Sequence, residues 1–145
     1  MKFFNVVSLN ISAEKGVPKK PVKRMVLIKD FGVSGDAHAG SGERQVSLLA
    51  SEDIDGVNAA GAGVGYGDFA ENITTKGIDL VSLTIGTQMK IGEVLLEISR
   101  IGKQCHEGCS IMRKTGSCIM PRRGVFAKVI EGGEISCENN GTYGF

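Results

Sequence analysis

The segment from residue 101 to residue 124 holds most of the side chains that could do chemistry. Its cysteines are Cys105, Cys109 and Cys118, and its basic residues are Lys103, Arg113, Lys114, Arg122 and Arg123. His106 follows Cys105 directly, and Glu107 is the one acidic residue. Because nearby positive charge favours a thiolate at neutral pH and also binds oxyanions, the segment is the natural place for a reactive or metal-ligating sulfur.

Each cysteine must be weighed against a purely structural role, since free cysteines are among the most buried residue types. The adjacent His106 favours a functional Cys105, while Cys109 is balanced between the two roles. For Cys118 and Cys137 we expect small buried side chains. The same cysteines with His106 could instead hold zinc in a tetrahedron. That alternative is the less favoured one, because its second pair of ligands would need the distant Cys137.

A second candidate segment is the glycine-rich stretch 35–40, which carries Asp36 and His38 and leads to Arg44. Small residues let a ligand approach the backbone, and a carboxylate next to an imidazole offers groups that could assist proton movement near neutral pH. Asp36 could equally cap a turn, with His38 hydrogen-bonded inside it. The sequence leaves these two interpretations open.

A third polar segment, residues 65–75, places Asp68, Glu71, Asn72 and Thr74 between glycine turns. These side chains could line a pocket or could satisfy the backbone of a loop. The glycines before them copy the spacing of a dinucleotide fingerprint, but no predicted strand precedes them and no predicted helix follows. We therefore do not expect a nucleotide site.

The bulk properties predict one domain over residues 1–145. The formal net charge is +1, from 17 basic and 16 acidic residues, which argues against nucleic acid or a membrane as a partner. The apolar run near the N-terminus is too short for a signal peptide or a membrane span. We therefore expect a cytoplasmic protein with reduced cysteines.

The elements that must position these residues are mostly short strands. Glycine is about twice as frequent as usual, with 21 residues, and implies many tight turns. Strands are predicted at 6–11, 22–28, 91–98 and 134–137, and a further β-like run begins near 80. Helices are predicted at 47–60, with Ser51 as the cap, and at 125–131. Residues 31–44 are predicted to form a long loop. This pattern predicts a mainly β, closed or nearly closed barrel with a few short helices and without alternating βαβ units.

Three blocks of the sequence together resemble the MOSC family, which is named for the C-terminal domain of molybdenum cofactor sulfurases. They are residues 35–40 leading to Arg44, Gln45 and Val46, residues 69–74, and the strand at 91–92 running into residues 101–105. Each block is weak by itself. Their order and spacing cover most of the chain and make the resemblance specific.

The resemblance implies a β-rich barrel and a cysteine that binds molybdenum or carries sulfur. Cys105 matches that position, and Cys109 stays open as the ligand because some relatives space their cysteines differently. An anionic cofactor would find candidate contacts at Arg44, Asn72, Thr74, Lys103, Arg113, Arg122 and Arg123.

Two functions follow from this resemblance. The first is a module that binds molybdenum cofactor or handles its sulfur through the reactive cysteine. The second is a carrier or adaptor that delivers cofactor or sulfur to a partner, such as a molybdoenzyme or a cofactor-biosynthesis protein. The chain has no room for a pyridoxal-phosphate desulfurase fold, so pyridoxal phosphate would act only through a separate partner domain.

Overall fold

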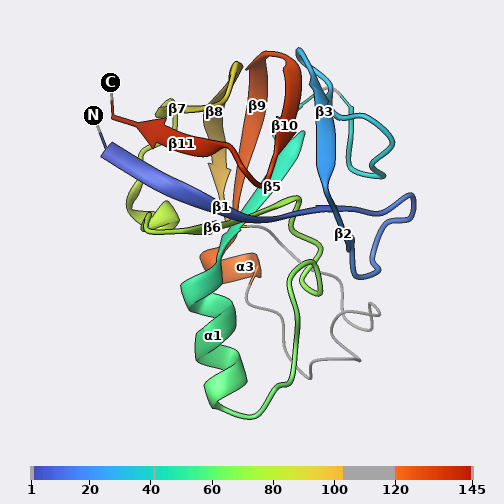
Figure 1. The fold of residues 1–145 in the computed structure, drawn as a ribbon, viewed down its shortest axis with the longest axis vertical. Helices are drawn as coiled ribbons and strands as arrows, with labels where there is room; N and C mark the ends of the chain where they lie inside the picture. Colours follow the sequence, from blue (N-terminus) through green and yellow to red (C-terminus); the bar gives the residue numbers. More distant parts are fainter. Residues whose placement is uncertain (1, 41, 103–119, 145) are drawn as a thin grey trace.

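A computed structural model describes residues 2–40, 42–102 and 120–144 of the chain (Figure 1). The strands are β1 (Lys2–Ile11), β2 (Lys20–Val22), β3 (Arg24–Ile28), β4 (Gly32–Val33), β5 (Val46–Ala50), β6 (Ile73–Lys76), β7 (Gln88–Ile91), β8 (Val94–Ile101), β9 (Val125–Glu131), β10 (Gly133–Ser136) and β11 (Asn140–Tyr143). The helical elements are α1 (Ser51–Ala59), the short 3-10 turn η1 (Leu80–Ser82) and α3 (Met120–Arg123).

Seven strands close into a barrel, in the order β1, β11, β7, β8, β9, β5 and β6, with β6 pairing back to β1. The ten-residue β1 makes this closure possible, because its first half pairs with β11 and its middle pairs with β6. Its last residues pair with β2, and β3 forms a separate small sheet with β10 and β4. The predicted mainly β barrel is confirmed.

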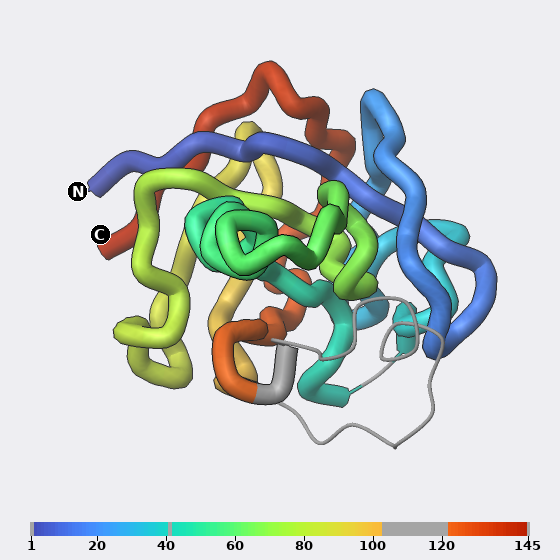
Figure 2. Tube along the Cα trace, turned by 90° about the horizontal axis from the view of Figure 1, so that it is seen from below, coloured from blue at the N-terminus to red at the C-terminus, as the bar shows by residue number. Residues whose placement is uncertain are grey.

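Apolar side chains fill the interior of the barrel. Strand β8 alternates buried and half-buried positions, so Val94, Leu96 and Ile98 point into the main core. A smaller second core covers one end of the barrel, where Ile54 of α1 packs with Phe69 and Phe126. Figure 2 looks at this end and shows α1 end-on, with the two chain termini side by side at the edge. One end of the barrel is therefore capped by the helix.

The predicted helix at 125–131 is wrong, because these residues form strand β9. In a helix, one face would carry Val125, Phe126, Val129 and Ile130. A strand that is buried between two neighbouring strands also has a nearly continuous apolar sequence, so the pattern fits both structures. β9 lies between β8 and β5 and pairs with both. Sheet pairing on both edges decides the outcome.

The predicted helix at 47–60 is correct only in its second part. Residues 46–50 form β5, and α1 begins at Ser51 with Ala50 in the capping position and no side-chain cap. β5 and β6 are parallel and are joined through α1, so the barrel contains one βαβ crossover that the sequence analysis did not predict. Tertiary burial of all five residues of β5 overrides the local helix signal.

Three other boundaries differ from the sequence prediction. The predicted strand 91–98 is two strands, since Gly92, with φ of 56°, forms the hairpin turn between β7 and β8. The predicted strand 22–28 divides between β2 and β3, and strand β10 ends at Ser136. Cys137, which was expected to be buried, is exposed just beyond that strand.

Among the described residues, no helix has the length and apolar character needed to cross a bilayer.

Candidate functional site

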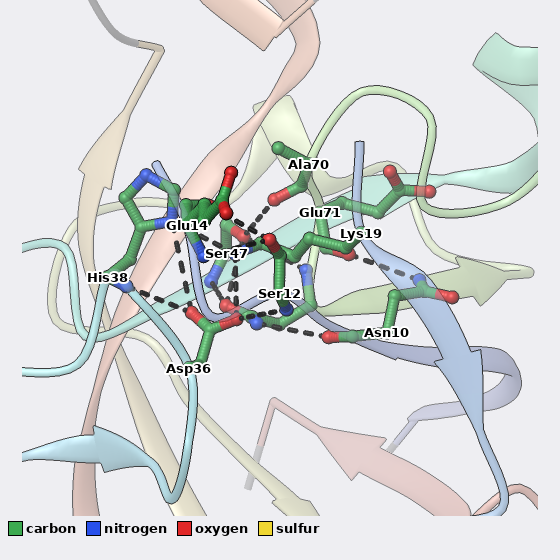
Figure 3. Close-up of polar contacts among 10 residues, drawn as sticks. Asn10, Ser12, Glu14, Lys19, Asp36, His38, Ser47, Ala70 and Glu71 are labelled. Carbon is green, nitrogen blue, oxygen red and sulfur yellow. Dashed lines mark hydrogen bonds and ion pairs between the residues drawn. The ribbon is translucent and has the colours of Figure 1, made fainter. Parts of the chain in front are cut away.

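Three chain segments meet outside the barrel strands at a buried charged cluster. Ser12 follows β1, Lys19 precedes β2, and the glycine-rich stretch after β4 supplies Asp36 and His38 (Figure 3). The side chains of Lys19 and Asp36 are both fully shielded from solvent. A charged pair at this depth is uncommon and must be satisfied within the protein.

Asp36 is the centre of the cluster. Its Oδ1 accepts hydrogen bonds from Lys19 Nζ at 2.8 Å and from the Ser12 backbone N–H at 3.1 Å, and its Oδ2 accepts from the His38 backbone N–H at 3.1 Å. Burial by itself raises the pKa of Asp36, but these hydrogen bonds and the Lys19 charge hold the pKa below its ordinary value. Asp36 is therefore an ionised anchor at neutral pH.

The imidazole ring of His38 also contacts the Lys19 ammonium. Lys19 Nζ is 2.9 Å from His38 Nδ1, whereas the nearer Asp36 oxygen is 3.8 Å from the same ring nitrogen. The ring is partly open, with 26% of the side chain exposed. The cluster thus presents one polar ring at the surface and keeps its charged pair beneath it.

A close backbone contact holds Lys19 in place. The Lys19 backbone N–H donates to the Gly67 carbonyl at 2.7 Å. Gly67 has φ of 86°, and a Cβ atom there would overlap with the carbonyl oxygen of Lys19. Only glycine fits this position without a shift of one of the two backbones. The segment before β6, through Gly67, therefore helps to position Lys19.

Asn72 and Thr74, two of the predicted cofactor contacts, lie in a buried polar network instead of at the surface. Asn72 Oδ1 accepts from the Ser47 backbone and hydroxyl, and Asn72 Nδ2 donates to the Asn10 carbonyl. Thr74 accepts from Asn10 Nδ2 and donates to Glu71 Oε2 at 2.8 Å. Both side chains are completely buried, and these bonds join β1, β5 and β6.

Glu71 is the acid of this inner network. Burial raises the pKa of Glu71, against the lowering effect of hydrogen bonds from Gly67 and Thr74. Among the described residues, Glu71 Oε1 and Thr75 Oγ1 have no hydrogen-bond partner. Such buried groups are costly unless a proton or water satisfies them.

The described arginines that were predicted to hold an anionic cofactor differ in their surroundings. Arg123 forms ion pairs with Asp53 at 3.0 Å and with Asp79 at 3.4 Å. Arg44 is exposed and lies 5.7 Å from the ring centre of Phe126, and Arg122 is exposed. The structure therefore gives Arg123 acidic partners of its own.

The other predicted site residues, which are Cys105, Cys109, Lys103 and Arg113, lie outside the described residues. The ends of the flanking strands are described. The Gly102 N–H donates to the Gly124 carbonyl at 2.7 Å, and Arg100 of β8 pairs with Glu43 at 3.4 Å. The stretch that carries Asp36 and His38 thus returns to β5 alongside the end of β8. Within the described parts, no group of three or more His, Cys, Asp or Glu side chains could hold a metal ion.

Comparison with known proteins gives this architecture a family. The sequence pattern of the MOSC domain matches residues 35–140. The chain belongs to the MOSC domain family. This MOSC domain is similar in fold to the crystal structure of the YuaD protein from Bacillus subtilis, with a TM-score of 0.78, 18% identity, and coverage of 97% of this chain and 94% of that one.

Two further solved structures share the fold of this MOSC domain. YiiM from Geobacillus stearothermophilus matches with a TM-score of 0.73 and 18% identity over 98% of this chain and 75% of that one. YiiM from Escherichia coli matches with a TM-score of 0.71 and 17% identity over 100% of this chain and 71% of that one. A comparison with curated protein sequences found no match.

The sequence analysis missed Lys19. It lies in a short run with Pro18, Lys20 and Pro21, and a basic run of this kind usually faces solvent. Lys20, its neighbour, is indeed exposed. No charge pattern distinguishes the two lysines, because the partner Asp36 lies 17 positions away in the sequence.

Proposed function

We propose that this MOSC domain binds molybdenum cofactor or handles its sulfur, with the Cys105 thiolate as the sulfur centre. The observation that carries the proposal is the buried Lys19–Asp36 pair, which holds His38 at the surface of the glycine-rich stretch that matches the family. A buried ion pair is weak evidence for stability, because the desolvation of its two charges is costly. Positioning a neighbouring polar side chain, here His38, is a functional reason for such a pair. Soft thiolate sulfur suits both molybdenum and sulfur chemistry.

The described residues fit an anionic cofactor in part. His38 offers a ring at the surface, and the exposed Arg44 and Arg122 offer cations without a carboxylate partner among the ion pairs of the described chain. Arg123 fits poorly, because Asp53 and Asp79 already neutralise it. We therefore assign the holding of an anionic group to His38, Arg44 and Arg122, together with Lys103 and Arg113. When bound, the cofactor would supply a molybdenum centre that can exchange sulfur or oxygen.

A carrier or adaptor role is the second candidate, and one observation favours it. Within the described parts of the chain, Asp36 is the carboxylate that lies beside His38, and it already accepts hydrogen bonds from Lys19 and from two backbone N–H groups. It is therefore poorly placed to act as a general base. A carrier would load cofactor or sulfur once and stop, whereas an enzyme would turn over with a sulfur donor.

The proposal is tested by native mass spectrometry and metal analysis on protein purified without oxygen. We expect the wild-type protein to carry a molybdenum–pterin adduct or the extra mass of one sulfur atom, and Cys105→Ser to lose it. Cys137→Ser is the matched control, because Cys137 is an exposed free cysteine outside the site and its loss should leave the adduct intact. An adduct that survives Cys105→Ser, or zinc alone in every variant, would contradict the proposal.

A further inference from the structure

We infer that Phe126 is a positioning residue, which holds the Arg44 guanidinium ready to bind a phosphate group of the ligand. The inference deepens the proposed function and rests on it, since it names the group that Arg44 receives and the side chain that prepares Arg44 for it. Arg44 contacts the ligand directly, whereas Phe126 acts through Arg44.

The Arg44 side chain lies over an aromatic ring. Its Cζ is 5.7 Å from the ring centre of Phe126, a distance within the range of a cation–π interaction. The ring itself is held firmly, because Phe126 is 3% exposed and belongs to the second core together with Leu49, Ile54 and Phe69. The guanidinium therefore lies on a well-packed surface that does not have to form when a ligand arrives.

The backbone on both sides of Arg44 is also tied to the barrel. The Glu43 carbonyl accepts a hydrogen bond from the Ser99 hydroxyl of β8. The fully buried side chain of Gln45 accepts a hydrogen bond from the Val129 backbone N–H of β9 at 3.0 Å. Because this backbone is already fixed, a ligand at Arg44 has less conformational entropy to overcome.

The N–H groups of Arg44 remain available for a ligand. Within the described chain, this exposed side chain makes no ion pair and no hydrogen bond. A guanidinium has five N–H donors in one plane, and two of them can bind two oxygens of a phosphate at once. Arg100 gives the contrast, since it pairs with Glu43 at 3.4 Å and donates from Nε to the Gly102 carbonyl at 3.1 Å. Arg44 therefore keeps the donors that an oxyanion needs.

An arginine can also cover an aromatic ring without binding any ligand. A change to lysine separates the two roles, because lysine keeps the charge and an apolar stem but lacks the planar pair of N–H donors. If Arg44 only covers the ring of Phe126, phosphate binding is absent or is unaffected by this change. If Arg44 binds phosphate, the change weakens binding.

The direct test is a titration of the full-length protein with sodium phosphate at constant ionic strength, followed by the arginine side-chain N–H signals in ¹H–¹⁵N spectra. The Arg44 signal is the one that Arg44→Lys lacks. We expect this signal to shift saturably with phosphate and to stay in place with chloride. No saturable shift, or an equal shift with chloride, would overturn the inference. Acetate should bind more weakly because it carries less charge, and tighter binding of acetate would overturn the assignment to phosphate.

The affinity of Arg44→Lys for inorganic phosphate then measures the role of the guanidinium. We expect binding to be roughly 2- to 10-fold weaker than in the wild type, as for the loss of one hydrogen bond. The matched control is Arg100→Lys, which keeps a cation beside Glu43 and should bind phosphate as the wild type does. Equal affinities in the two variants would overturn the role of Arg44.

The variant Phe126→Leu tests the positioning role. It removes the ring but keeps an apolar side chain in the second core, so phosphate should bind roughly 2- to 5-fold more weakly, as for the loss of an exposed cation–π interaction. The matched control is Phe69→Leu, which removes a ring from the same core and should leave phosphate binding unchanged. Equally weak binding in both variants would show that a loosened core is the cause and would overturn the role of Phe126.

Because Phe126→Leu can fail to fold, the motion of the arginine side chains in the wild type gives a second measurement. We expect ¹⁵N relaxation to show that the Arg44 Nε–H is more rigid than that of Arg122, another exposed arginine. Equal mobility of the two side chains would overturn the positioning role.

These results are distinguishable from the outcome of the Cys105 test. If phosphate shifts the Arg44 signal but the wild-type protein carries no adduct, the proposed function fails and the phosphate site stands. If the adduct is present and phosphate leaves the Arg44 signal unchanged, the inference fails and the proposed function stands.

Discussion

Lys19 is the residue on which the candidate site depends most. Its ammonium is fully buried and bridges Asp36 and His38. Such a pair costs desolvation on both sides, and breaking it leaves one charge in the interior without its partner. The identity of residue 19 should therefore affect stability far more than its place in a basic run suggests.

At this scale we predict that Lys19→Met lowers the free energy of unfolding by about 3–5 kcal/mol, because Asp36 stays buried without its cation. Lys19→Met with Asp36→Asn should cost less than the single change, since no buried charge is left. Urea denaturation followed by circular dichroism measures both. The matched control is Lys20→Met, which removes an exposed lysine and should change stability by no more than about 0.5 kcal/mol. A Lys19→Met protein as stable as Lys20→Met would contradict the buried pair.

Residues around the site show how far the sequence could predict it. Asp36 and His38 were found from their types and glycine-rich surroundings, and the structure brings both into one cluster. Lys19 could not be found, because burial and a partner 17 positions away leave no local pattern. Asn72 and Thr74 were found as polar residues, but the sequence could not tell a pocket lining from a buried network. Local composition identifies polar segments, and only the fold decides which atoms face solvent.

At the scale of elements, the crossover from β5 through α1 to β6 supplies the turn that supports the site. The stretch after α1 returns through Gly67, whose backbone touches that of Lys19. The short loop before β2 is therefore held by a segment far along the chain. This contact links the barrel's one parallel strand pair to the charged cluster.

We predict that Gly67→Ala lowers the free energy of unfolding by more than about 1–2 kcal/mol, because a Cβ at this positive φ is strained and also overlaps with the Lys19 carbonyl. Gly63→Ala is the matched control. Gly63 also has positive φ, at 66°, but nothing lies within 4 Å of the position that its Cβ would take. It should show the backbone cost alone, about 1 kcal/mol. Equal losses in thermal or urea denaturation would show that the contact with Lys19 is unimportant.

The sequence predicted an element correctly where its apolar residues fit one period, helical or strand. It failed where the same residues fit both periods. Strand β1 was expected from its alternation, whereas β9 was expected to be a helix because Val125, Phe126, Val129 and Ile130 fit either period. The length of β1 beyond its predicted start at Val6 was also missed, since Lys2 to Asn5 become a strand by pairing with β11. Long-range pairing supplied what the local sequence lacked.

At the scale of the whole molecule, Asp36 and Glu71, the two buried carboxyl groups of the described residues, act on stability in opposite directions as pH changes. The pKa of Asp36 is lowered from 3.8, so its stabilising contribution is present above that value and is lost as pH falls through the folded-state pKa. Burial raises the pKa of Glu71 above 4.5, so its contribution is complete below that value and is lost as pH rises through the folded-state pKa. The charged cluster around Asp36 therefore stabilises the fold most at higher pH, and the inner network around Glu71 stabilises it most at lower pH.

We therefore predict that the melting temperature of the wild-type protein rises, relative to that of Glu71→Gln, as the pH is lowered from about 8 toward about 5. The neutral glutamine has no proton to gain, so its variant lacks this dependence while it keeps a similar size. Asp36→Asn supplies the comparison of opposite sign, because its deficit against the wild type should be largest at neutral pH and should shrink below pH 3.8. Differential scanning calorimetry of the three proteins, from about pH 8 down to below pH 3.8, gives the result. A constant difference between the wild type and Glu71→Gln would mean that Glu71 is as easily ionised in the folded barrel as in the unfolded chain, and that burial in the Asn10–Thr74 network does not govern its proton.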